Sequence, residues 1–337
     1  MTGFKRTLIL LLSLTLTTSC GQPNLLTDVS ETDSDEALFF EAKKKIDKLE
    51  WSAAIDIIEN QMSDGYAAQV DVQEALAGAY AGKCGFTFVD IINGLKNSSS
   101  TSIFPFFMSI FAGNTLDTSA CDRSISIITS FGSVLQRTND QNLFLTILGI
   151  ARIGTTLGAK LDPTLDGVAD GVYKTDFNVC HNYSGAPGTN TATDGWPPAN
   201  PVPPAPIDPA NPLSIPAPAA APNRSITDTE AKKVASGIGI IFENMSALAA
   251  VLSGGNSTLT ALQDALTQCE AVAGAGNCTA TNVAAVTPEL LYTIRVLMDS
   301  SAMGFGTCTP GAAPAPPAPY DLNDPSYCCI RLKPPVP

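Results

Sequence analysis

The chain has 337 residues, of which 45% are hydrophobic and 15% charged, and its 32 acidic and 19 basic residues give a formal net charge of −13. This length and composition suit one or two globular domains and exclude a fibrous or wholly disordered chain. The negative charge opposes binding to nucleic acid and to anionic lipid surfaces, so no nucleic-acid partner is expected.

The first 19 residues have the pattern of a secretory signal peptide. Lys5 and Arg6 precede an apolar run over residues 7–16, which is shorter than the roughly 20 apolar residues needed to cross a bilayer. The sequence TTSCG that follows resembles the lipobox of bacterial lipoproteins. The resemblance implies a diacylglycerol on Cys20, and Gly21 after the cysteine implies the outer membrane. The alternative is a secreted protein in which Cys20 is an ordinary thiol.

Helical patterns begin after a short polar segment. Residues 20–35 are polar and acidic and should form a flexible tether. Apolar residues then recur with helical spacing from residue 36, with a break expected near residues 49–52, and the same layout returns over about 70–96. This part of the chain is therefore expected to form two antiparallel helical hairpins.

Part of this segment is similar to tetratricopeptide (TPR) repeats. KLEWSAAIDII resembles the middle of a repeat, with Ala54 at the small-residue position, and LAGAY, which ends at Tyr80, resembles a first-helix pattern. Val89 follows Ala54 at about the 34-residue TPR period. The resemblance covers about residues 36–96 and implies a rigid groove for a peptide or partner helix, with Trp51 and Tyr80 as candidate contacts. An ordinary pair of helical hairpins is the alternative.

The next segment, TSIFPFFMSIFAG, gathers aromatic side chains around a proline. One interpretation is a ligand lid or a membrane-touching loop, in which Phe104, Phe106 and Phe107 would bind. The other is that these rings fill the core.

Two helices should follow, at about 120–138 and 140–158. The second is apolar on nearly every side and is interrupted by Arg152, so a central core helix is expected rather than a membrane span. The acidic residues within 161–171 are explained by a capped helix start. The EF-hand spacing is absent, and neither a metal nor a cofactor is expected.

The second half of the chain begins with a change of composition. Residues 183–224 are rich in proline and alanine and should form an extended linker after an N-terminal helical domain of residues 36–182. Helices resume over 225–304, opened by a Thr-x-x-Glu capping box, and residues 305–337 are expected to be coil held by cysteines. The predicted fold is all-α, a helical bundle or short α-solenoid of antiparallel hairpins stapled by disulfides.

Nine cysteines support export. If Cys20 carries a lipid, an even number remains, which in an exported chain indicates up to four disulfides. Cys269 and Cys278 are the best local pair, and Cys84 with Cys121 is a candidate in the N-terminal half. The disulfide candidates are Cys84, Cys121, Cys180, Cys269, Cys278, Cys308, Cys328 and Cys329.

Catalytic motifs are missing from the sequence, and no enzyme is expected. His181 is the single histidine, and there is no Walker loop, nucleophile elbow or dinucleotide fingerprint. The expected function is binding or scaffolding of a protein or peptide partner by a lipid-anchored envelope protein, facing the periplasm or the cell surface. The alternative is a periplasmic carrier that encloses a small hydrophobic ligand between the helices around 101–158.

Overall fold

The computed structural model describes residues 33–85, 88–97, 102–161, 169, 226–252, 257–298, 300 and 303–305. This part of the chain is helical and contains no β-strand, so the all-α fold class is confirmed. Several features predicted from the sequence lie outside the described residues: the signal peptide, Cys20, most of the tether, the acidic residues of 162–168 and 170, His181, the linker, Cys180, Cys308, Cys328 and Cys329.

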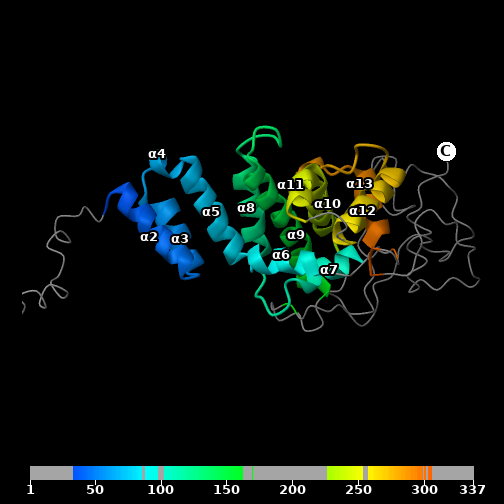
Figure 1. Cartoon of the computed structure of the whole chain (residues 1–337), viewed down its shortest axis with the longest axis horizontal. Helices are drawn as coiled ribbons and strands as arrows, with labels where there is room; N and C mark the ends of the chain where they lie inside the picture. Colours follow the sequence, from blue (N-terminus) through cyan, green and yellow to red (C-terminus); the bar gives the residue numbers. More distant parts are fainter. Residues whose placement is uncertain are drawn as a thin grey trace, which may run out of the picture.

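Figure 1 shows the helices in chain order. They are α2 (Asp35–Asp47), α3 (Trp51–Asp56) with its π-helical continuation η1 (Ile57–Gln61), α4 (Asp64–Ala67), α5 (Val70–Lys83), α6 (Phe88–Asn97), α7 (Ile103–Ser109), α8 (Thr118–Thr129), α9 (Asn139–Leu161), α10 (Asp228–Glu243), α11 (Met245–Val251), α12 (Ser257–Ala273), the 3₁₀ turn η2 (Val283–Ala285) and α13 (Pro288–Met298). Helix α8 is shorter than predicted, because a turn at Gly132, with φ of 118°, separates it from α9.

The break between α2 and α3 falls within the predicted residues 49–52. Leu49 has a φ of 60°, in the left-handed region. Its amide donates to the Ile46 carbonyl, and the Glu50 amide donates to the Lys45 carbonyl. These two bonds form a Schellman motif, in which the residue in the left-handed conformation is usually glycine.

The helices form a row in which each packs mainly on its neighbours. α2 packs on α3, α3 on α5, α5 on α8, α8 on α9, α9 on α10 and α10 on α13. In Figure 1 this row runs from the blue helices at one end, through α8 and α9, to the yellow and orange helices at the other. The C-terminal helices therefore share one core with α7, α8 and α9.

Helix α5 pairs differently from the prediction. In the predicted second hairpin, α6 would run antiparallel to α5 and pack against it. The helices that pack most extensively on α5 are instead α3 and α8. Ser124 on α8 donates a 2.7 Å hydrogen bond to the Ala77 carbonyl on α5. A disulfide joins Cys84, just after α5, to Cys121 on α8, with 5.2 Å between their Cα atoms. These contacts hold α8 against α5.

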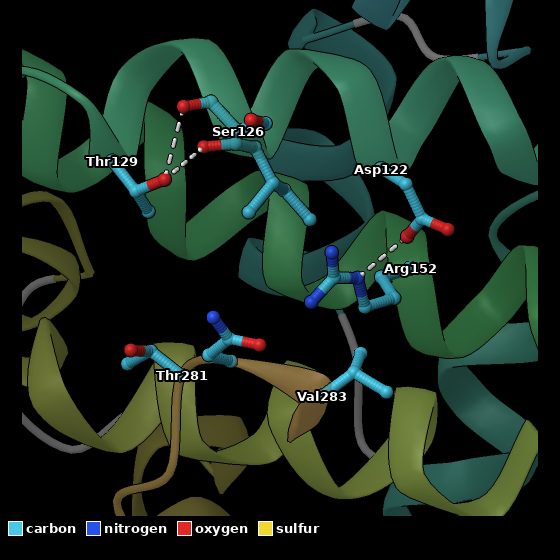
Figure 2. Close-up of a pocket in the computed structure, with 8 residues that line it drawn as sticks. Asp122, Ser126, Thr129, Arg152, Thr281 and Val283 are labelled. Carbon is cyan, nitrogen blue, oxygen red and sulfur yellow. Dashed lines mark hydrogen bonds and ion pairs between the residues drawn. The ribbon is translucent and has the colours of Figure 1, made fainter. Parts of the chain in front are cut away.

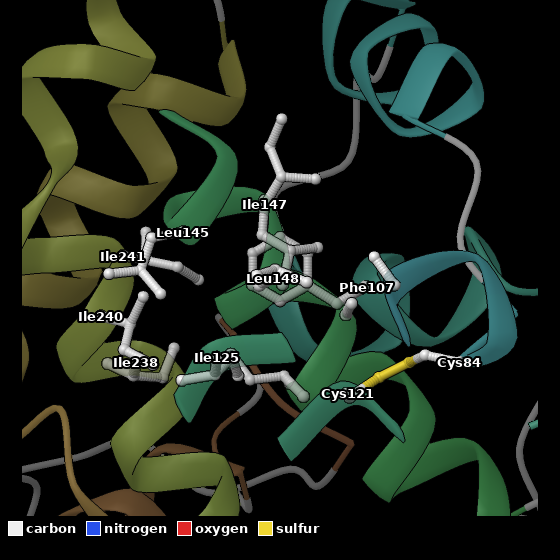
Figure 3. Packing of buried hydrophobic residues seen from close by; sticks show 14 of the residues in the cluster. Cys84, Phe107, Cys121, Ile125, Leu145, Ile147, Leu148, Ile238, Ile240 and Ile241 are labelled. Carbon is white, nitrogen blue, oxygen red and sulfur yellow. A yellow bond between two sulfur atoms is a disulfide. The ribbon is translucent and has the colours of Figure 1, made fainter. Parts of the chain in front are cut away.

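Helix α9 lies at the centre of the described core. Its length and apolar composition would allow it to cross a membrane, but 83% of its apolar window is buried inside the protein. The α10–α11 pair, which is bent by 64°, would also be long and apolar enough if it were counted as one span. In Figure 3, Leu145 lies near Ile241 of α10, and Leu148 lies toward Phe107 of α7. The helix therefore serves as a core element, as the sequence indicated.

Candidate functional site

The aromatic residues of α7 occupy two environments. Phe104 and Phe107 are buried, with 2% and 0% of their surface exposed. Helix α9 comes close to this segment at Gly154, where a Cβ would lie 2.5 Å from the Phe107 carbonyl oxygen and 2.6 Å from the Phe111 ring. Of the two interpretations of this segment, the burial of Phe104 and Phe107 favours the one in which the rings fill the core. Phe106 is half-buried, with its ring centroid 5.9 Å from that of Phe107.

Trp51 and Tyr80 both lie where α5 packs against α3 and its continuation η1. The half-buried Trp51 indole lies over Gly82, which has no side chain to obstruct it. The Tyr80 hydroxyl donates to Glu59 Oε2 at 2.9 Å, and Arg123 on α8 reaches Glu59 Oε1 at 3.4 Å. Burial raises the pKa of Tyr80, and the Glu59 hydrogen bond adds to this effect. These side chains join three helices at a partly exposed surface.

The N-terminal helices carry most of the exposed large hydrophobic residues in the described part of the chain. Phe40 on α2 is 58% exposed, Leu49 in the following turn 65%, and Val70 at the start of α5 56%. The fourth such residue is Leu135, 93% exposed, between α8 and α9. Exposed apolar residues thus concentrate at the end of the helical row that begins at α2.

A cleft that was not predicted from the sequence opens between α8, α9 and the segment that leads into η2. Its volume is about 320 Å³. It combines two charged side chains with hydroxyl, amide and apolar groups (Figure 2). The lining residues are Asp122, Ile125, Ser126, Thr129, Arg152, Thr281, Asn282 and Val283.

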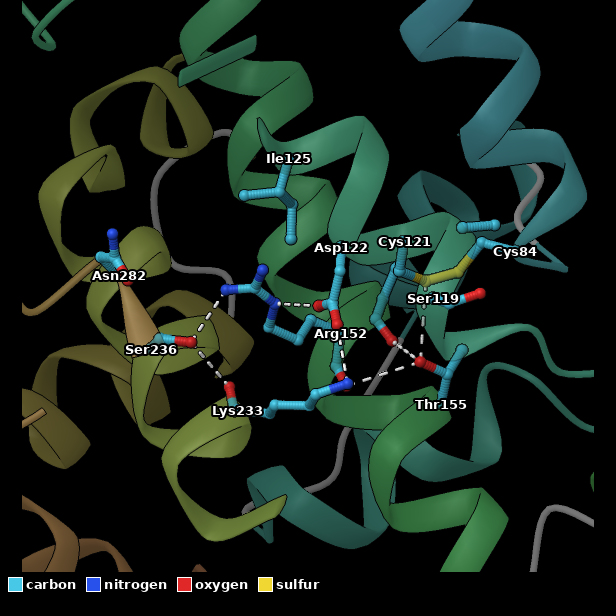
Figure 4. Close-up of polar contacts among 12 residues, drawn as sticks. Cys84, Ser119, Cys121, Asp122, Ile125, Arg152, Thr155, Lys233, Ser236 and Asn282 are labelled. Carbon is cyan, nitrogen blue, oxygen red and sulfur yellow. Dashed lines mark hydrogen bonds and ion pairs between the residues drawn. A yellow bond between two sulfur atoms is a disulfide. The ribbon is translucent and has the colours of Figure 1, made fainter. Parts of the chain in front are cut away.

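Arg152 is the central charged group of this cleft and is only 6% exposed. Its Nε donates to Asp122 Oδ1 at 2.9 Å, and its Nη1 donates to Ser236 Oγ on α10 at 2.8 Å. Lys233 Nζ lies 2.7 Å from Asp122 Oδ2. Figure 4 shows this network crossing from α8 through α9 to α10. Burial lowers the pKa of Arg152, whereas Asp122 opposes the shift, and arginine stays charged at neutral pH.

The third guanidinium nitrogen of Arg152, Nη2, makes no hydrogen bond to any residue whose position is described. It is not among the side-chain atoms of the described residues that are fully buried and lack a partner, so Arg152 Nη2 is not fully buried. Because Arg152 lines the cleft, Nη2 is accessible from it. The only sequence signal for this site is a charged residue within an apolar helix. Its partners come from helices far apart in the chain, and no spacing pattern connects them.

No cluster of three or more histidine, cysteine or carboxylate side chains suitable for a metal occurs in the described ranges. No family model matches the chain, and no curated protein or solved structure matches it either. Any function must therefore be argued from the residues themselves.

Proposed function

We propose that this protein is a lipid-anchored binding protein of the bacterial cell envelope that engages a protein or peptide partner through helices α2 to α5. The observation that carries the proposal is that three of the four exposed large hydrophobic residues in the described part of the chain lie between α2 and the start of α5, namely Phe40, Leu49 and Val70. Exposed apolar side chains on helical surfaces are the usual anchors for a partner helix or peptide.

Leu49 gives a second argument for a binding role. The left-handed conformation costs a residue with a Cβ about 1–2 kcal/mol relative to glycine. Burial of the leucine side chain offsets little of this cost, because 65% of its surface is exposed. A leucine at this position contributes little to folding, and its exposed side chain supports a role in contact with a partner.

The anchoring part of the proposal is supported by the lipobox-like residues before Cys20. The tether of residues 20–35 leads directly into α2, so a lipid at its start would hold the α2–α5 surface close to the membrane. Acyl chains would have to supply this attachment, since a chain with a net charge of −13 is repelled by anionic lipid headgroups.

Crosslinking in living cells, followed by detergent extraction and mass spectrometry, tests both parts. We expect a stoichiometric protein partner crosslinked to residues 36–96 and a diacylglycerol-modified peptide beginning at Cys20. The double variant Phe40→Ser with Val70→Ser should lower recovery of the partner by roughly tenfold, because two contact anchors are lost. The matched control is Leu135→Ser, which removes an even more exposed apolar residue away from these helices.

Two results would contradict the proposal. If the Leu135→Ser control loses the partner as completely as the double variant, the α2–α5 surface is not the binding site. If no protein is crosslinked and denaturation releases a small hydrophobic molecule, the protein is a carrier.

A further inference from the structure

Arg152 is held in an unusual state for a charged residue. Only 6% of its surface is exposed, yet of its three guanidinium nitrogens only Nε and Nη1 donate hydrogen bonds to protein groups in the described part of the chain. The Nη2 donor instead faces the cleft, in a side chain whose other surface is almost fully removed from water. An anionic oxygen placed in the cleft beside Nη2 would accept a hydrogen bond from it, and charge-assisted bonds of this kind are among the strongest in proteins.

The charges around the cleft favour a single negative charge. Arg152 and Lys233 each carry one positive charge, and Asp122 between them carries one negative charge, so the group has a net charge of +1. Both oxygens of Asp122 are already engaged, Oδ1 by Arg152 and Oδ2 by Lys233. This arrangement weakens the repulsion that Asp122 would exert on an incoming anion. A monoanion balances the site, whereas a dianionic phosphate leaves excess negative charge.

The shape of the cleft limits the size of the ligand. Its volume of about 320 Å³ is near the lower end of ligand pockets. Ile125 and Val283 supply apolar walls. The segment that bears Val283 lies close to α10 because Gly239 has no side chain, and a Cβ there would collide with the backbone of Ala280. The wall of the cleft that contains Val283 is therefore held in place by its close contact with α10.

We propose that this cleft binds a small molecule bearing one carboxylate, with the carboxylate on Arg152 Nη2 and the apolar body between Ile125 and Val283. The site is separate from the protein-binding surface on α2 to α5, and either proposal can fail without the other. The amide of Asn282 and the hydroxyls of Ser126, Thr129 and Thr281 add neutral polar groups to the same cleft.

The test compares an acid with its neutral amide on the purified full chain. Benzoate and benzamide have the same ring and differ at the group that meets Arg152. Calorimetric titration should show benzoate binding at least about tenfold more tightly than benzamide, the difference expected for one charge-assisted hydrogen bond. Inorganic phosphate should bind more weakly than benzoate.

Three variants locate the binding. Arg152→Gln should abolish the preference for benzoate over benzamide. Ser126→Leu narrows the cleft from its exposed rim without touching the Arg152 network, and it should weaken benzoate binding by about tenfold or more. The matched control is Arg123→Gln, which removes the same charge from another face of α8 and should bind benzoate like the wild type.

Ser126→Leu decides the question if Arg152→Gln does not fold. The proposal is overturned if the wild type does not bind benzoate, if benzamide or phosphate binds as tightly, or if Ser126→Leu retains full binding.

Discussion

Leu49 is the residue at which local backbone conformation and side-chain identity are most clearly in conflict. Glycine adopts the left-handed conformation without the steric cost of a Cβ, although it also loses more conformational freedom on folding. Leu49→Gly should therefore raise the free energy of unfolding, by up to about 1 kcal/mol, measured by urea denaturation. The expected gain is small because the two effects oppose one another.

A glycine control separates this effect from the general cost of adding glycine. Ala68 has a φ of −77° in the right-handed helical region. Ala68→Gly should lower the unfolding free energy by about 0.5–1 kcal/mol. A loss of stability of similar size in Leu49→Gly would show that the exposed leucine side chain makes stabilising contacts.

Asp35 should give the protein a specific dependence on acid. Its pKa lies below the ordinary value, chiefly because the Ser63 hydroxyl donates to Oδ2 at 2.5 Å and also because the Ser63 amide donates to Oδ1 at 2.8 Å. A carboxylate with a lowered folded-state pKa stabilises the fold above its unfolded-state pKa of about 3.9, and this contribution is lost as the pH falls through the folded-state pKa.

Asp35→Asn should consequently be less stable than the wild type at pH 6, and the difference should shrink as the pH falls below about 4. Urea denaturation at a series of pH values measures this. Ser63→Ala should show the same convergence, together with a constant loss because Ser63 also caps α4 by accepting from the Tyr66 amide. A difference that stays constant down to low pH would show that Asp35 acts without titrating.

At the scale of elements, the contact between α9 and α10 depends on two glycines that face each other. A Cβ on Gly237 would lie 2.7 Å from Ile153 Cγ1 and 2.9 Å from the Gly149 carbonyl oxygen. Overpacking of this kind costs about 1–3 kcal/mol, which exceeds the gain of up to about 1 kcal/mol in helix propensity. Gly237→Ala should therefore lower the free energy of unfolding.

Gly78 on α5 provides the matched control, because a Cβ there meets nothing within 4 Å. Gly78→Ala should raise the unfolding free energy by up to about 1 kcal/mol through helix propensity. Chemical denaturation of both variants gives the comparison. If both substitutions stabilise the protein, α9 and α10 can separate enough to admit a methyl group, and the close contact is not required.

Local signals predicted individual elements better than their pairing. The capping box at the start of α10 is present, with the Glu230 amide donating to Thr227 Oγ1 and the Thr227 amide donating to the Glu230 carboxylate. The pairing of α5 with α8 was not predictable in the same way. It depends on contacts such as that between Ser124 and Ala77, which are far apart in the chain and leave no periodic signal.

The same limit explains why the cleft was not predicted and why the sequence leaves the role of the α7 aromatic residues open. Helical spacing identifies an apolar face but does not show what covers it, so Phe104 and Phe107 were compatible with a ligand and with burial in the core. Arg152 was visible as an interruption in an apolar helix. Its partner Ser236 lies on another helix 84 residues away, which only the tertiary structure brings close.

For the molecule as a whole, the contact between α5 and α8 connects the proposed binding surface to the core. Ser124 and Arg123 reach across it from α8, one to the α5 backbone and the other to Glu59. The disulfide between Cys84 and Cys121 adds a covalent link at the end of α5.

Removal of each disulfide should therefore have different consequences. The Cys84–Cys121 bond closes a separation of 37 residues and the Cys269–Cys278 bond one of 9 residues. Loop-closure entropy predicts that the longer loop contributes about 4 kcal/mol to the free energy of unfolding and the shorter about 2.5 kcal/mol. Paired alanine variants, unfolded in urea, should follow that order.

Hydrogen exchange of the same variants should also show where the protein loosens. Without the Cys84–Cys121 bond, amide exchange should rise in α2 to α5 while α9 remains protected, because the N-terminal helices then join the core through noncovalent contacts alone. Without the Cys269–Cys278 bond, the rise should be confined to the end of α12 and the turn that follows. If amide exchange in α9 rises as much as in α2 to α5 in the first variant, the N-terminal helices and the core unfold as one cooperative unit. The contact between α5 and α8 would then not separate two independently unfolding parts.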